Sequence, residues 1–178
     1  MKKSIIYGAI LLLTSFCCYS QKPFSFLNRQ GKLHVVFNYD KLVIQGLPEN
    51  DYLEWLEMRN PKAVDQWENA KATLFGEGFT FHLNKNINTN RIRLLCGEYP
   101  DALYQATVYV RNVSRNYEKI TFEVVFTRKV NNELFATIKT TGKSRGYGGI
   151  RAGSYTYKAR TAFNHAGQNL GKIIASKI

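Results

Sequence analysis

Cysteine is scarce in this chain of 178 residues, which excludes a disulfide framework. Two of the three cysteines, Cys17 and Cys18, stand at the end of an N-terminal leader, so Cys96 is the only thiol of the remaining sequence. One thiol cannot close an internal disulfide, and stability therefore has to come from packing. Cys96 ends the largely apolar run 92–96 with no histidine beside it. We interpret it as a buried strand residue and not as a catalytic thiolate.

Long hydrophobic runs are also missing. The apolar stretch 5–13 follows Lys2 and Lys3, is too short to cross a membrane, and leads to the small residue Ser20. This layout is typical of a secretory signal peptide over residues 1–20. We predict cleavage after Ser20 and a periplasmic or secreted protein without a transmembrane helix in the mature chain.

The alternative leader is that of a lipoprotein anchored at Cys17 or Cys18. Lipid attachment requires a small residue just before the acylated cysteine, whereas Phe16 precedes Cys17, and Cys17 itself precedes Cys18. Ordinary cleavage is therefore favoured, and membrane association through a lipid is the second interpretation.

Acidic residues are absent from the end of the chain. Glu133 is the last of them, and eight basic residues follow it: Lys139, Lys143, Arg145, Arg151, Lys158, Arg160, Lys172 and Lys177. The formal net charge of the chain is +12. We expect the cations after Glu133 to form a strongly positive face, and such a face attracts anionic ligands and acidic proteins. The chain has no RRM or KH signature, so nucleic acid is not the anion that we predict.

Composition and patterning indicate one α+β domain. At 44% hydrophobic residues the chain can build a packed core, which we place in residues 32–178 after an irregular connecting segment, 21–31. Alternating apolar and polar residues predict a three-stranded antiparallel meander over residues 103–141, with Asn131-Asn132 in its second turn. A further strand is predicted over residues 33–39, and residues 42–44 either continue it or pair with it.

Helical patterns occur in three places. One short helix is predicted over residues 52–58, and another runs from Asn60-Pro61 to the glycines at 76 and 78. Residues 79–83 alternate as Phe-Thr-Phe-His-Leu and are predicted to be extended. The last helix begins at Ser154 and carries one apolar stripe. We expect a four- to five-stranded, mainly antiparallel sheet with two main helices packed on one face.

A glycine-rich loop, residues 142–153, joins the meander to the last helix. Glycine-rich backbone and helix N-termini present N–H groups to anions, and nearby cations add full charges. The candidate binding residues for an anion or a partner are Lys143, Arg145, Tyr147, Arg151 and Ser154. The competing interpretation is that the glycines only allow the chain to turn and that the cations are solvated.

Enzyme motifs are missing. The sequence has no HExxH, no GxSxG and no zinc-spaced cysteine and histidine cluster, and His34, His82 and His165 are widely separated. We therefore predict no metal and no cofactor, and we favour a non-catalytic protein. The alternative is a secreted hydrolase whose carboxylates meet only on folding, with Glu98, Asp101 and Glu123 as candidates.

The order of these elements resembles a family of exported Gram-negative envelope proteins of unknown function. The resemblance rests on the meander 103–141, the loop 142–153, and the helical segments 160–163 and 166–172. More remotely, the chain is similar to the α/β domains of penicillin-binding-protein activator and curli-secretion lipoproteins. The resemblance implies an envelope adaptor whose partner is another envelope protein or an anionic ligand, and it implies no catalytic residue.

Overall fold

A computed structural model describes residues 23–88, 92–144 and 155–178. The predicted leader, including Cys17 and Cys18, lies outside these residues. The strands are β1 (Lys32–Asn38), β2 (Val43–Ile44), β3 (Leu47–Pro48), β4 (Leu95–Gly97), β5 (Tyr104–Val113), β6 (Lys119–Arg128) and β7 (Glu133–Lys143). The helices are α1 (Glu49–Glu57), α2 (Pro61–Asn69), α3 (Phe75–Ile87) and α4 (Tyr155–Lys177), with a 3-10 turn at Ser25–Leu27 and a π-helical turn at Ala70–Leu74. No described helix has the length and hydropathy that a membrane span requires.

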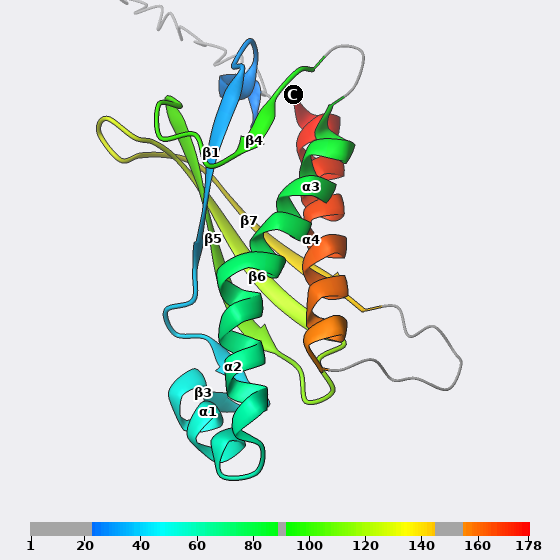
Figure 1. The fold of residues 1–178 in the computed structure, drawn as a ribbon. Coiled ribbons are helices and arrows are strands. Elements are labelled where there is room, and N and C mark those ends of the chain that lie inside the picture. The colour runs from blue at the N-terminus through cyan, green and yellow to red at the C-terminus, as the bar shows by residue number, and fades with distance from the viewer. Residues whose placement is uncertain (1–22, 89–91, 145–154) are drawn as a thin grey trace, which may run out of the picture.

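The predicted α+β class is confirmed, and the predicted meander is present as β5, β6 and β7. Asn132 has a positive φ of 55° in the turn between β6 and β7, a conformation that asparagine tolerates well. Figure 1 shows α3 and α4 side by side on the same face of the sheet. The alternating buried residues of β6 point toward this helical layer, since Phe122 contacts both Phe79 and Phe163.

The predicted sheet was too small and too uniformly antiparallel. The described sheet has seven strands, and β1 pairs in parallel with both β4 and β5, while β2 pairs in parallel with β5. Parallel neighbours arise because the long helical connection between β1 and β4 returns the chain to the end of the sheet where β1 began. β2, β3 and β4 have only two or three residues each, too few to show an alternating pattern.

The predicted end of the second helix at Gly76 and Gly78 is wrong, and so is the extended segment at 79–83. The chain stays helical from Pro61 to Ile87 through α2, the π-helical turn and α3. Phe75, Phe79, Leu83 and Ile87 are all fully buried, and their four-residue spacing is that of one helix face. Burial of this face outweighs the low helix propensity of the two glycines.

The two long helices approach each other closely in a parallel arrangement. A side-chain carbon added at Gly167 of α4 would lie 2.1 Å from the carbonyl oxygen of Phe79, and one at Gly171 would lie 2.8 Å from that of Leu83. Gly142 of β7 lies equally close to the backbone of α4, at Ala162. These glycines remove the side chains that would otherwise separate α4 from α3 and from the sheet. The predicted apolar stripe of α4 is confirmed, since Ala159, Phe163, Ala166 and Leu170 are buried.

Candidate functional site

Only one of the five predicted site residues can be placed. Arg145, Tyr147, Arg151 and Ser154 lie outside the described residues, whereas Lys143 ends β7 with an exposed side chain. Its direct cross-strand partner on β6 is Lys119, which is also exposed. Like charges directly opposite each other destabilise a sheet, so this pair is costly in the absence of an anion.

The position of Lys143 is fixed by α4. The backbone N–H of Lys143 donates to Nδ1 of His165 at 3.2 Å, and the Asn169 side chain donates to the Thr141 carbonyl at 3.0 Å. Among the described strands β7 pairs with β6 alone, so these two contacts complete part of its outer edge. The exposed Arg115 occupies the turn at the same end of the sheet. Arg115, Lys119 and Lys143 are called the basic end of the sheet below.

Two acidic side chains near the basic end already have cationic partners. Glu118 accepts from Lys158 at 3.3 Å, so one of the C-terminal cations has a counter-charge from an earlier part of the chain. Glu123 accepts from Arg111 at 2.7 Å. Neither carboxylate forms an ion pair with Lys119 or Lys143 within the described part of the chain.

The three carboxylates of the hydrolase alternative lie in different surroundings. Asp101 pairs with Lys32 at 2.7 Å on the exposed surface, and the hydrogen bond from Lys32 lowers the pKa of Asp101. Glu123 pairs with Arg111 and alternates with the buried residues of β6, so it faces away from the helices. Glu98 lines a pocket beside β1. The structure therefore does not assemble Glu98, Asp101 and Glu123 into one cleft.

The three histidines lie on separate elements. His34 of β1 accepts a hydrogen bond from the Tyr99 backbone N–H at 3.1 Å, and His165 of α4 accepts one from Lys143. His82 lies on α3 and not on the predicted strand, and burial together with the neighbouring Lys85 lowers its pKa. Among the described residues no group of three or more potential ligands is placed to hold a metal ion.

Cys96 occupies β4 and is 2% exposed, as the interpretation of a buried strand residue requires. Burial raises the pKa of its thiol to about 12. At about pH 8 the folded protein therefore holds almost no thiolate, which is the reactive form.

We expect iodoacetamide to leave Cys96 unmodified in the folded protein at about pH 8 and to alkylate it fully in denaturant. Mass spectrometry of the peptide that contains Cys96 measures both reactions. Equal rates of alkylation with and without denaturant would show that the thiol is accessible and ionised.

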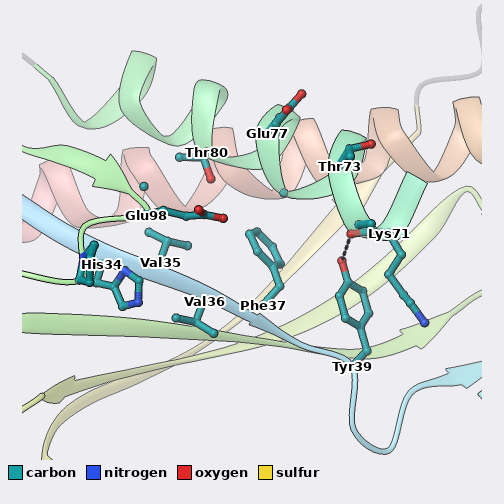
Figure 2. A pocket seen from close by; sticks show the side chains of 14 residues that line it. His34, Val35, Val36, Phe37, Tyr39, Lys71, Thr73, Glu77, Thr80 and Glu98 are labelled. Atoms are coloured by element: carbon teal, nitrogen blue, oxygen red, sulfur yellow. Dashed lines mark hydrogen bonds between the residues drawn. The ribbon is translucent and has the colours of Figure 1, made fainter. Parts of the chain in front are cut away.

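The sequence did not indicate a pocket of about 850 Å³ that lies between β1 and the helical layer (Figure 2). We call it the β1 pocket. Figure 2 shows the Glu98 side chain beneath Thr80, whereas the Glu77 side chain points away from β1. The lining residues come from three parts of the chain: 34–37 and Tyr39 from β1 and the residue after it, 71–73, Gly76, Glu77 and Thr80 from the π-helical turn and α3, and Gly97, Glu98 and Pro100 from the end of β4 and the segment that follows it. Three segments that are distant along the chain line the pocket, so no local sequence pattern predicts it.

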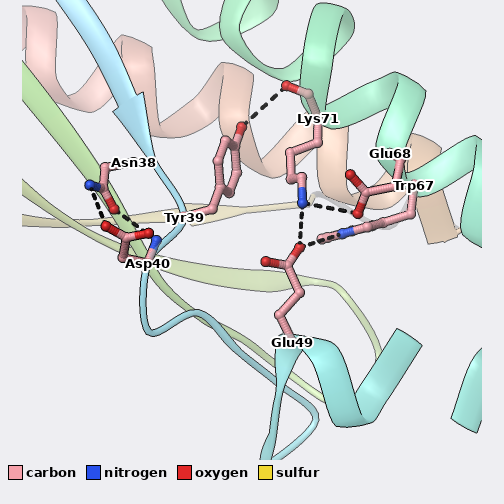
Figure 3. A network of polar contacts seen from close by, with 7 residues as sticks. All are labelled: Asn38, Tyr39, Asp40, Glu49, Trp67, Glu68 and Lys71. Carbon is pink, nitrogen blue, oxygen red and sulfur yellow. Dashed lines mark hydrogen bonds and ion pairs between the residues drawn. The ribbon is translucent and has the colours of Figure 1, made fainter. Parts of the chain in front are cut away.

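A polar network holds one end of the β1 pocket (Figure 3). The Lys71 ammonium donates to Glu49 at 2.8 Å and to Glu68 at 2.9 Å, and the Trp67 indole N–H donates to Glu49 at 3.0 Å. Burial alone would lower the pKa of Lys71, but its hydrogen bonds to the two carboxylates raise it. The Tyr39 hydroxyl donates to the Lys71 carbonyl at 3.5 Å, and burial raises the pKa of Tyr39. The positive charge of Lys71 is thus already paired with the carboxylates of Glu49 and Glu68.

Comparisons with known proteins find remote structural similarity only. No family model matches the sequence, and no curated protein matches it. A Xanthomonas campestris protein of the family DUF330 aligns with a TM-score of 0.39 and 9% identity, over 82% of this chain and 81% of the other. PelC from Paraburkholderia phytofirmans, crystallised as a dodecamer, aligns with TM-scores of 0.35 and 0.33 in two crystal forms, at 13% and 12% identity, over 82% of this chain and 88% of PelC.

Both neighbours come from Gram-negative bacteria. They do not test the resemblance to penicillin-binding-protein activators and curli-secretion components, which stays a prediction. At such TM-scores they identify neither a site nor an assembly of this protein. The chain is therefore remotely similar to two Gram-negative proteins, and its function has to be inferred from its own residues.

Proposed function

We propose that this chain is an exported, non-catalytic binding or adaptor protein of the periplasm or cell envelope. Its contact surface is the basic end of the sheet together with the glycine-rich loop that follows Lys143. Through this surface it binds an anionic ligand or an acidic partner. The leader over residues 1–20 supports export.

The juxtaposition of Lys119 and Lys143 is the observation that carries this proposal. A cross-strand pair of like charges costs roughly 0.2–1 kcal/mol relative to a neutral pair. The sequence that follows Lys143 contains Arg145 and Arg151 and no acidic residue, so that segment is itself positively charged. A bound anion would offset the repulsion, because it interacts favourably with both ammonium groups.

The variant Lys119→Glu distinguishes a role of Lys119 in binding from its effect on stability. It places a carboxylate directly opposite Lys143, so we expect the free energy of unfolding to rise by about 0.5 kcal/mol. We expect the same variant to bind a fluorescent hexaglutamate peptide about tenfold more weakly at low salt, as measured by anisotropy. A solvated lysine with no binding role predicts the stabilisation without the loss of affinity.

Lys62→Glu is the matched control, because Lys62 is exposed on α2 and the substitution changes the net charge equally. The proposal predicts that this control weakens binding by less than about twofold. Equal losses of affinity in Lys62→Glu and Lys119→Glu would show that the peptide responds to net charge and not to the basic end.

A further inference from the structure

On the side of β1 that faces away from β5, the neighbouring strand β4 covers only the first part of β1. β4 pairs with β1 only from Lys32↔Leu95 to His34↔Gly97, whereas β5 pairs with β1 from His34 to Asn38. The Leu95 N–H donates to the Gly31 carbonyl, and alternation along a strand places the backbone groups of Val35 and Phe37 on this same edge. The Val35 carbonyl and both backbone groups of Phe37 thus lie beyond the end of β4. The described residues supply no strand to pair with them there.

Where β4 is present, a side chain of α3 forms hydrogen bonds with its outer edge. The Asn84 side chain donates to the Cys96 carbonyl at 2.8 Å and accepts from the Cys96 N–H at 2.8 Å, which completes the outer edge of β4. Thr80 and Gly76 lie one and two turns earlier on α3, and both line the β1 pocket. The pocket therefore occupies the space that a longer β4 would fill.

The unpaired charge in the β1 pocket is negative. Glu77 and Glu98 are exposed, and neither forms an ion pair within residues 23–88, 92–144 and 155–178. The cation that lines the pocket, Lys71, is bound by Glu49 and Glu68. The local sign is thus opposite to the net charge of +12, so a cationic ligand would be attracted to this site and not to the protein as a whole.

We propose that the β1 pocket binds an extended peptide segment that carries lysine or arginine. The segment adds to the edge of β1 as a strand, accepting a hydrogen bond from the Phe37 N–H and donating to the Val35 or Phe37 carbonyl. Glu77 and Glu98 select for its cationic side chains. This site is separate from the basic end of the sheet, which attracts ligands of the opposite charge.

The test uses the full chain and an acetylated, amidated peptide, Thr-Lys-Val-Lys-Val-Lys-Thr. We expect the peptide to slow hydrogen exchange of the Phe37 amide at least about tenfold, as measured by NMR, because the amide gains a partner. Methylation of the backbone nitrogens of the three central residues of the peptide should abolish this protection, since it removes N–H donors on both edges of the peptide strand. An unchanged Phe37 exchange rate at saturating peptide, or equal protection by the methylated peptide, would overturn strand addition.

Paired protein variants test the role of charge. Glu77→Gln/Glu98→Gln should weaken peptide binding about tenfold, whereas Glu54→Gln/Glu57→Gln on the exposed surface of α1 removes the same charge and should leave it unchanged. Equal affinities of the two double variants would contradict recognition by Glu77 and Glu98. Lys119→Glu should leave binding of this basic peptide intact, which separates the β1 pocket from the basic end.

Discussion

Gly167→Ala is expected to lower the free energy of unfolding by about 3 kcal/mol, a large effect for one added methyl group. The new carbon would lie 2.1 Å from the Phe79 carbonyl oxygen of α3. The carbonyl belongs to the backbone of α3 and the new methyl group is attached rigidly to the backbone of α4, so relief requires the two helices to move apart and to loosen the contacts between them. Urea denaturation followed by circular dichroism measures the change.

Gly76→Ala provides a helical control for this substitution. Its added carbon would meet only the ring of Phe37, at 3.3 Å, and the higher helix propensity of alanine works in its favour. We expect a change in unfolding free energy of less than about 1 kcal/mol. Equal effects of Gly76→Ala and Gly167→Ala would show that the two helices do not pack as closely as described.

Phe163→Ala is expected to destabilise the protein by about 4 kcal/mol. Phe163 is 1% exposed and stacks on Phe75 with 4.6 Å between ring centroids, and it also meets Phe122 of β6 edge-on at 5.0 Å. It therefore joins α3, α4 and the sheet, and its removal leaves a cavity bounded by all three.

Phe81→Ala is the matched control, because Phe81 is 65% exposed on α3 and its loss leaves no cavity. We expect this variant to lie within about 0.5 kcal/mol of the wild type by the same denaturation measurement. A comparable loss of stability in both variants would contradict the placement of Phe163 at the centre of the core.

The meander was predictable because its signal is local. Buried and partly exposed residues alternate in β5 as far as the bulge after Val110 and in β6 as far as Phe126, and the helical stripe of α4 repeats over six turns. Each pattern depends on neighbours within one element, so the sequence alone contains it. The parallel pairing of β1 was not predictable, since it depends on the path of the chain between Asn38 and Leu95.

The error at residues 79–83 has a physical origin. A Phe-Thr-Phe-His-Leu segment has the period of a strand, and two glycines precede it, so local rules favour an extended chain. The wider spacing of Phe75, Phe79, Leu83 and Ile87 indicates a helix, and the packing of α3 against α4 decides between the two. Gly78 fits because its missing side chain leaves room for Asn164 of α4.

The candidate sites differ in how far the sequence reveals them. The run of cations after Glu133 draws attention to Lys143, but only strand register brings Lys119 opposite it. The β1 pocket is built from β1, from the π-helical turn with α3, and from the end of β4 with the residues after it, and these three segments are far apart along the chain. Its unfilled edge results from the short length of β4, and no residue type signals that feature.

The most direct measurement is an NMR titration of the isotope-labelled protein with hexaglutamate. We predict that the largest amide shifts occur at Arg115, Lys119 and Lys143, and that about 0.3 M salt reverses them because the interaction is electrostatic. Shifts spread over exposed lysines such as Lys62 and Lys85, with none at Lys119 and Lys143, would contradict a binding site at the basic end of the sheet.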